Sequence, residues 1–289
     1  MSSTEPSLPE SHTLLTGLVM GESPRWHDHR LWFSDFGANQ VRTVDLEGVS
    51  EVVAPVPGMP MGLGFLPDGR LLIVSARDGL LLRREPDESV VTHADLTAFG
   101  PHPWSDMVVD GRGNAYVGNL GFDFPAGQFA PGILALVTAH GSARQVADGI
   151  AFANGMVVTP DNSTLILAET YANRLTAFDI AADGTLSNRR VWAELPGAYP
   201  DGICLDAEGA VWYADVPGKH CVRVREGGEM LQTVGLDRGC FACTLGGPDG
   251  GTLFMMAADF SNPAKAMSGG ERTGEVLTIE APAPGAGWP

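Results

Sequence analysis

A strand–turn–strand unit recurs along the whole chain, and this repeat limits the possible folds more than any other feature of the sequence. Each unit has a short apolar run, a turn of Pro, Asp, Gly or Asn residues, and a second apolar run. Clear examples are MVVDGRGNAYVGN from Met107, MVVTPDNSTLILAE from Met156 and ICLDAEGAVWYAD from Ile203. Such a pattern predicts β-hairpins. Six units begin roughly 40 to 50 residues apart, which is the period of four-stranded propeller blades.

We therefore predict an all-β fold, a six-bladed β-propeller with four-stranded blades. Further strands are expected between the hairpins, at Gln40–Leu46, Gly79–Arg84, Gly132–Val137, Arg174–Ile180, His220–Arg225 and Gly274–Ile279. The segment Thr13–Met20 can pair with the last block and close the ring, which removes an exposed sheet edge. No segment has the helical periodicity that a doubly wound α/β fold requires. The predicted organisation is one propeller domain over residues 13–280, with flexible segments at 1–12 and 281–289.

Composition and charge exclude several classes of function. The chain has 289 residues, of which 44% are hydrophobic, so it can bury a large core. Its 18 Lys and Arg residues against 35 Asp and Glu residues give a net charge of −17, which disfavours binding to nucleic acid or an anionic membrane. The start has no basic n-region, and no apolar run is long enough to span a bilayer. We expect a cytoplasmic protein, a monomer or small homo-oligomer, that acts on a small molecule.

Three short stretches carry the candidate chemistry. They are GESP at 21–24, FANGM at 152–156 and YPDGI at 199–203. Each has one oxygen-bearing side chain (Glu22, Asn154 or Asp201) beside a turn-forming Gly or Pro, just ahead of a predicted strand. Alone, each motif is common turn chemistry. Equivalent positions in blades one, four and five converge on the axis, however, and two carboxylates with an amide oxygen suit Ca²⁺, Mg²⁺ or Mn²⁺.

These motifs, in this order and on this repeat, resemble the gluconolactonase, regucalcin (senescence marker protein) and luciferin-regenerating-enzyme family of six-bladed propellers. The resemblance covers residues 13–280 and includes the late LGGPDGGTLF segment from Leu245. It implies that Glu22, Asn154 and Asp201 bind one divalent ion, with Ca²⁺ the first choice and Zn²⁺, Mg²⁺ or Mn²⁺ as alternatives. It also implies that Asp201 serves as a base. A bound cation that polarises a carbonyl and acidifies water would support hydrolysis of a lactone.

The third blade departs from the family pattern. The family motif R-x-N-D is replaced by PWSD, so that Pro103 stands in the Arg position and Ser105 in the Asn position. A serine hydroxyl is a poorer cation ligand than an amide, and loss of the Arg removes a strong donor for polyhydroxylated or anionic groups. Several residues can instead form an apolar mouth: Met59, Met61, Trp104, Phe122, Phe124 and Tyr171. We therefore predict a lactone that is less polar than a simple sugar lactone.

The candidate substrate-binding residues are Ser105, Trp104, His102, Asn119, Tyr171 and Met61. Glu169, beside Tyr171, is interpreted as a buried structural carboxylate. The four cysteines are expected to stay reduced, because only Cys240 and Cys243 have a C-x-x-C spacing and no secretion signal is present.

Other functions remain open at this point. The altered third-blade motif is also compatible with a metal-assisted isomerase, cyclase or lyase on a small hydrophobic molecule, or with hydrolysis of related esters or phosphotriesters. A non-catalytic calcium-binding propeller is a further alternative, because fold does not fix function. A serine hydrolase is not indicated, because the chain has no G-x-S-x-G elbow.

Overall fold

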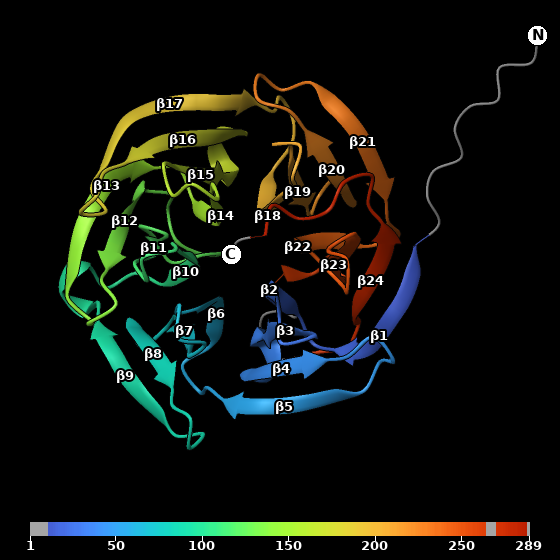
Figure 1. The fold of residues 1–289 in the computed structure, drawn as a ribbon, viewed down its shortest axis with the longest axis horizontal. Helices are drawn as coiled ribbons and strands as arrows, with labels where there is room; N and C mark the ends of the chain where they lie inside the picture. Colours follow the sequence, from blue (N-terminus) through green and yellow to red (C-terminus); the bar gives the residue numbers. More distant parts are fainter. Residues whose placement is uncertain (1–10, 264–269, 288–289) are drawn as a thin grey trace, which may run out of the picture.

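The structure is a computed structural model that describes residues 11–263 and 270–287. Over these residues the chain forms six four-stranded antiparallel sheets, arranged as blades around a central axis (Figure 1). This confirms the predicted six-bladed β-propeller. Among the described residues, no helix has the length and hydrophobicity that a membrane crossing requires.

Within each blade the strands run in order from the axis to the rim (Figure 1). Blades one and two consist of β2 (Gly21–His27), β3 (Arg30–Asp35), β4 (Gln40–Val44) and β5 (Ser50–Pro55), then β6 (Pro60–Phe65), β7 (Leu71–Ser75), β8 (Leu80–Arg84) and β9 (Val90–Asp95). Blades three and four consist of β10 (Trp104–Val109), β11 (Ala115–Asn119), β12 (Gly132–Val137) and β13 (Ala143–Ile150), then β14 (Ala153–Val158), β15 (Thr164–Glu169), β16 (Arg174–Ile180) and β17 (Leu186–Glu194). Blade five consists of β18 (Pro200–Leu205), β19 (Val211–Asp215), β20 (His220–Val224) and β21 (Met230–Gly235). Short 3-10 turns lie at Phe36–Ala38, Thr97–Phe99 and Thr170–Ala172.

Blade six joins the two ends of the described chain. It consists of β22 (Gly239–Gly246), β23 (Thr252–Ala258), β24 (Gly274–Glu280) and, as its outermost strand, β1 (His12–Leu18). The pairing of β1 with β24 runs from His12 opposite Thr278 to Leu18 opposite Gly274. The first strand therefore closes the ring, as the sequence predicted.

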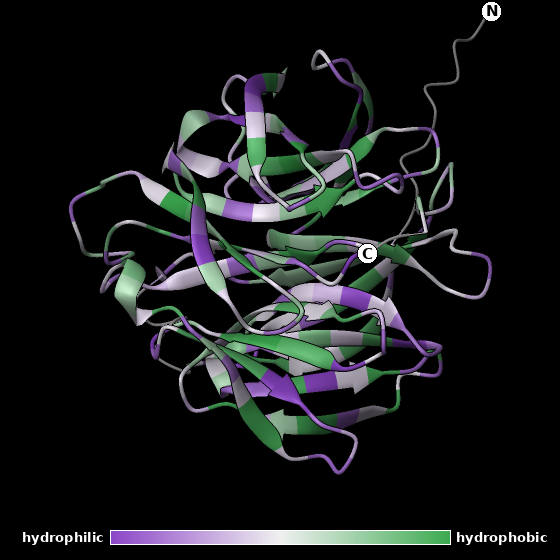
Figure 2. Cartoon of the chain, turned by 60° about the vertical axis from the view of Figure 1, so that its left-hand side comes forward, coloured by the Kyte–Doolittle hydropathy of each residue, from purple (hydrophilic) through white to green (hydrophobic). Residues whose placement is uncertain are grey.

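The hydrophobic core lies between neighbouring blades, where the face of one sheet packs on the next. One cluster combines Val157 and Ile166 of blade four with Ile203 and Tyr213 of blade five, and similar clusters fill the other blade interfaces. Figure 2 shows that the strongly hydrophobic residues lie mainly in strands, and that many of the turns are hydrophilic. All four cysteines are buried and free, as predicted: Cys204, Cys221, Cys240 and Cys243.

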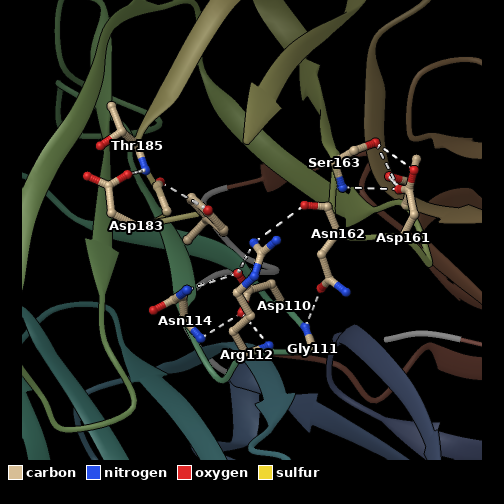
Figure 3. A network of polar contacts seen from close by, with 12 residues as sticks. Asp110, Gly111, Arg112, Asn114, Asp161, Asn162, Ser163, Asp183 and Thr185 are labelled. Atoms are coloured by element: carbon tan, nitrogen blue, oxygen red, sulfur yellow. Dashed lines mark hydrogen bonds and ion pairs between the residues drawn. The ribbon is translucent and has the colours of Figure 1, made fainter. Parts of the chain in front are cut away.

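The Asp-rich hairpin turns at one end of the central channel are structural. Asp110 Oδ1 accepts hydrogen bonds from the backbone nitrogens of Arg112 at 2.9 Å and Asn114 at 2.8 Å. The neighbouring Gly111 nitrogen donates to Asn162 Oδ1, at 2.5 Å, and so links the turns of blades three and four (Figure 3). Asp206 repeats the Asp110 arrangement in blade five. These polar side chains stabilise the turns and leave the opposite end of the channel free for chemistry.

The segment 281–287, expected to be flexible, packs across the same end as these turns. Gly285 forms a bridge with Asp206, and the Ala286 nitrogen donates to the Leu205 carbonyl at 3.1 Å. Figure 1 places this end of the chain near the axis. Residues 1–10 of the predicted flexible N-terminal segment, and residues 288–289, lie outside the described residues.

The first strand of every blade is irregular near its start, and this irregularity positions the site. The register shifts between Glu22 and Arg25 in blade one, and equivalent shifts follow Pro60, Trp104, Ala153, Pro200 and Cys240. Such bulges redirect side chains. We expected Glu22, Asn154 and Asp201 to lie just ahead of the strands. This was wrong, because each is the second residue of its strand.

Gly155 follows Asn154 and Gly202 follows Asp201, and both glycines are required by packing and not by a turn. A Cβ atom on Gly155 would lie 2.5 Å from the Ile203 backbone nitrogen, and one on Gly202 would lie 2.5 Å from the Ala242 Cβ. Neither glycine has a positive φ. Interpretation of Asn-Gly and Asp-Gly as turn signals was therefore wrong here. The first strands of adjacent blades approach so closely at the axis that only glycine fits.

Candidate functional site

Residues near the start of the first strands form the floor of a cavity at the other end of the channel. Each blade contributes one residue, and together these are Glu22, Met61, Ser105, Asn154, Asp201 and Phe241. The cavity has a volume of about 370 Å³. The residues two positions earlier in five blades, each directly ahead of its strand, line the wall: Met20, Met59, Pro103, Phe152 and Tyr199.

Loops that follow the second strands complete the wall. They contribute Phe36, Arg77, Leu120, Thr170, Val216 and Phe260. A repeated backbone hydrogen bond ties these loops to the wall. The Phe36 nitrogen donates to the Met20 carbonyl at 3.0 Å, and the Thr170 nitrogen donates to the Phe152 carbonyl at 3.2 Å. The cavity is thus built from equivalent positions of all the blades.

The lining is largely apolar, and both of its acids, Glu22 and Asp201, lie on the floor. Predicted substrate contacts Ser105, Trp104, Tyr171 and Met61 all line the cavity. Phe124 and Phe152 also line it, with their ring centroids 5.2 Å apart. Phe122 packs on Phe124 at 6.3 Å but is not part of the lining.

Hydrogen bonds orient the polar side chains of the floor. The Ser23 nitrogen donates to Glu22 Oε2 at 2.9 Å. Asn154 Nδ2 donates to Thr170 Oγ1 at 3.2 Å, and its side chain also hydrogen-bonds to the Asp201 carboxylate. Thr170 Oγ1 in turn donates to the Pro200 carbonyl at 2.8 Å. Because the side-chain nitrogen of Asn154 makes these bonds, the side-chain carbonyl oxygen is left to bind a cation or to accept a hydrogen bond.

Both carboxyl groups of the floor have a raised pKa. Burial raises the pKa of Glu22 well above its ordinary value, and the negative charges of Asp201 and Asp106 raise it further. Burial also raises the pKa of Asp201, where the hydrogen bond from Asn154 acts in the opposite direction and the charges of Asp106 and Asp215 add to the increase. Glu22 is buried and Asp201 partly buried, and two such acids that repel each other are costly unless a cation joins them.

A third acid lies directly below the floor. Asp106 Oδ1 accepts hydrogen bonds from Ser23 Oγ at 2.8 Å and from the Met107 nitrogen at 2.7 Å. Arg25 Nη2 lies 3.7 Å from the same oxygen. Asp106 is therefore held by neighbouring groups, while its charge still acts on Glu22 and Asp201.

The donor set fits a hard divalent cation. Two carboxylates and an amide oxygen are the ligands that Ca²⁺ and Mg²⁺ prefer, and their convergence on one floor provides the required negative charge. Among the described residues, no group of three or more His, Cys, Asp and Glu side chains is arranged to hold a metal ion. The floor has two side chains of those types, and its third oxygen ligand is the amide of Asn154.

Two predicted substrate contacts lie outside the cavity lining. His102 Nδ1 lies 3.1 Å from Asp123 Oδ1 on an exposed part of the loop. Asn119 is buried, and its side chain is occupied by backbone groups: Nδ2 donates to the His102 carbonyl at 2.8 Å, and Oδ1 accepts from the Gly121 nitrogen at 2.9 Å. We therefore leave both out of the proposed site.

Glu169 has the structural role that the sequence predicted. Its carboxylate is fully buried and receives hydrogen bonds from Arg174, Arg189, Thr176 and the Ala151 nitrogen. Burial acts to raise its pKa, but these donors outweigh burial and lower the pKa below its ordinary value. Glu169 thereby stabilises blade four behind the cavity wall.

Sequence reasoning missed Thr170, Phe241 and Arg77. Thr170 directly follows Glu169 and precedes Tyr171, so its place after a second strand was a usable signal. Phe241 occupies in the sixth blade the repeat position that Glu22 occupies in the first, and this equivalence was a usable signal. Arg77 lies in a loop whose direction depends on how the blades stack.

Comparisons with known proteins cover nearly the whole chain. Pentonolactonase XacC of Haloferax volcanii is 26% identical over 271 residues, which are 90% of this chain and 89% of that protein. The 6-deoxy-6-sulfogluconolactonase of Pseudomonas putida is 24% identical over 94% of both chains. The solved structure of regucalcin of Agrobacterium tumefaciens, described as a calcium-binding protein, matches with a TM-score of 0.79 at 20% identity and covers 96% of each chain.

The family profile gives the same result. The family model described as "SMP-30/Gluconolactonase/LRE-like region" matches residues 20–259. This range includes all six floor residues. The chain therefore belongs to the SMP-30/gluconolactonase/LRE-like family.

Proposed function

We propose that this protein is a divalent-metal-dependent hydrolase that opens a lactone, with Ca²⁺ as the first choice of ion. The observation that carries this proposal is the floor itself, where one buried and one partly buried carboxyl group and an amide from three blades meet in one cavity. Family membership and the lactonase names of two relatives support the reaction class. Glu22, Asn154 and Asp201 are the proposed ligands.

A bound divalent ion would supply Lewis-acid polarisation of the lactone carbonyl and a lowered pKa for a nearby water. Asp201 is the proposed general base, because its carboxylate lines the cavity beside the other proposed ion ligands, within reach of a bound water. The Asn154 hydrogen bond holds that carboxylate in place.

The proposed reaction adds one water across the acyl carbon–oxygen bond of the ring. Asp201 accepts a proton from the water as the water oxygen bonds to the acyl carbon. The ring carbon–oxygen bond then breaks, and the leaving alkoxide takes the proton from Asp201. The product is a hydroxy acid, and Asp201 returns to its starting state.

The wall favours a substrate less polar than a simple sugar lactone. Met59, Trp104, Phe124 and Phe152 offer apolar and aromatic surface. A hydroxyl buried against such a wall would lose its hydrogen bonds to water. Among the floor residues, Ser105 carries a hydroxyl group that can bind the substrate.

A lactone panel tests the proposal. Purified protein would be stripped with a chelator, reloaded separately with Ca²⁺, Zn²⁺, Mg²⁺ or Mn²⁺, and assayed on aryl, alkyl and sugar lactones. We expect turnover only after reloading, with a preference for the less polar lactones. The control is Asp249→Asn, which changes an exposed turn carboxylate whose bond is to the Gly251 nitrogen. Equal turnover by stripped and reloaded protein would refute metal dependence, and no turnover of any lactone would refute the reaction.

A further inference from the structure

Arg77 is the one cationic side chain among the described residues that line the cavity. It lies in the loop after β7, on the wall, whereas the acids Glu22 and Asp201 lie on the floor. Arg77 is exposed, and it shares the cavity lining with the apolar side chains of Met59, Met61 and Trp104. The cavity therefore has a negative floor, an apolar middle and one positive group on its wall.

The guanidinium of Arg77 has no protein partner among the described residues, whereas every other arginine there makes a side-chain hydrogen bond or ion pair. Among the described residues no ion pair joins it to the adjacent Asp78, whose carboxylate accepts a hydrogen bond from Ser75 Oγ at 2.7 Å. In a chain with a net charge of −17, an arginine without an acidic partner is unusual.

The backbone beneath Arg77 is held on both sides. The Arg77 nitrogen donates to the Gly58 carbonyl at 2.9 Å, and the Ala76 nitrogen donates to the Met59 carbonyl at 2.9 Å. The Trp104 nitrogen donates to the Ala76 carbonyl at 3.2 Å. These bonds fix the start of the side chain between blades two and three, so that its reach is directed over the cavity.

We propose that Arg77 binds a carboxylate of the substrate, and that the substrate is a lactone with an apolar body and a carboxylate group. This inference rests on the proposed function. A planar guanidinium binds a carboxylate through two parallel hydrogen bonds. With its anionic group at Arg77 on the wall, the substrate has its ester carbonyl toward the floor, where the proposed ion ligands lie. Arg77 thus supplies, from blade two, a cation that the Pro103 position of blade three lacks.

Calorimetric binding to non-hydrolysable rings tests this assignment apart from turnover. The probes are two aryl-substituted γ-lactams, one with a carboxylate on the aryl ring and the other with its methyl ester. They would be titrated into the protein as purified, in calcium buffer, for wild type, Arg77→Ala and Arg77→Lys. We expect Arg77→Ala to weaken binding of the carboxylate about 10- to 100-fold, the range for a hydrogen bond to a charged group, and to leave the ester within about twofold.

Arg77→Lys should recover part of the affinity for the carboxylate, because it keeps the charge and loses the planar fork. The control variant is Arg225→Ala, which removes an exposed arginine paired with Glu229 and should change neither affinity. Equal binding of the carboxylate by wild type and Arg77→Ala, or tighter binding of the ester by wild type, would overturn the inference.

Turnover separates this inference from the proposed function. On carboxylate-bearing lactones, Arg77→Ala should raise KM with little change in kcat, because Arg77 binds ground state and transition state alike. If lactones are hydrolysed without a carboxylate preference, the inference fails and the lactonase proposal stands. If the carboxylate lactam binds through Arg77 but no lactone is opened, the inference stands and the lactonase proposal fails.

Discussion

Glu22 and Asp201 lie on a cavity floor where, among the described residues, positive charge is scarce. Arg25 lowers the pKa of Glu22, but burial and the charges of Asp201 and Asp106 outweigh it. Such an arrangement is costly to the folded state and is retained where the acids have a chemical role. At the scale of single residues, the account therefore rests on these two carboxyl groups.

Asp201→Asn should reduce lactone turnover by about 10²- to 10⁴-fold, the usual effect of removing a general base. The fold should persist, because an amide of similar shape occupies the same place. Steady-state kinetics with a melting curve of the same sample measure both effects. Turnover at the wild-type rate would remove Asp201 from the mechanism, and a collapsed melting transition would show a structural role instead.

Glu22→Gln should stabilise the protein in chelator by about 1–3 kcal/mol at neutral pH, because it removes a buried charge. The raised pKa means that folded protein keeps a proton that the unfolded chain releases near 4.5. The free energy of unfolding of wild type therefore falls as pH rises from 4.5 through the raised value. In Glu22→Gln this fall should be smaller. Urea unfolding from pH 4 to pH 8, with exposed Glu47→Gln as the control, measures the difference, and parallel pH curves for wild type and Glu22→Gln would contradict it.

The sequence predicted that the proposed ligands come together. It also predicted part of the cavity lining, namely Met61, Trp104, Ser105 and Tyr171, but not the loop residues Arg77 and Thr170. Glu22, Asn154 and Asp201 each stand at the same phase of a visible repeat, so the period itself predicts their convergence. Arg77 and Thr170 lie in loops, where the path depends on backbone bonds to the neighbouring blade. Asn119 was expected to reach the substrate because it ends a channel-side strand, but its amide is used by the local backbone.

At the scale of elements, the bulged starts of the first strands place one residue per blade on the floor. The strand periodicity predicted the blades, and even the closing strand, because alternation is a local property. It did not predict why glycine follows Asn154 and Asp201. The close approach of two first strands depends on long-range packing. An Asp-Gly pair has the same sequence whether it forms a turn or lies in a closely packed strand.

Gly202→Ala should lower the free energy of unfolding by about 1–3 kcal/mol through overpacking against β22. The matched control is Gly235→Ala, because a Cβ there would have no atom within 4 Å and the glycine has no positive φ. Urea denaturation of the two variants compares them directly. If both lose the same stability, close packing of the first strands does not explain Gly202.

At the scale of the whole molecule, the ring is closed by a strand from the opposite end of the chain. Leu18 is 1% exposed at the end of β1 and packs with Phe33, Phe254 and Val276 at the junction of blades six and one. Closure therefore depends on contacts between residues more than 200 positions apart. The far end of the channel is crossed by 284–286, which leaves the cavity end for the substrate.

Leu18→Ala should cost about 2–5 kcal/mol, the usual range for a buried leucine truncated to alanine. The control is Leu46→Ala, because Leu46 is 40% exposed. Chemical denaturation with a structural and an activity readout would show whether the ring opens as one unit. Similar stability for the two variants would mean that β1 contributes little to closure.

Calorimetric titration of Ca²⁺ into chelator-stripped protein tests the central claim most directly. We predict one ion bound per wild-type chain, about 10- to 100-fold weaker binding or none in Glu22→Gln and Asp201→Asn, and no change in Asp249→Asn. Loss of binding and loss of lactone turnover should occur in the same variants. Absence of binding to wild type by Ca²⁺, Zn²⁺, Mg²⁺ and Mn²⁺ alike, or wild-type affinity in both floor variants, would contradict a metal site made by these residues.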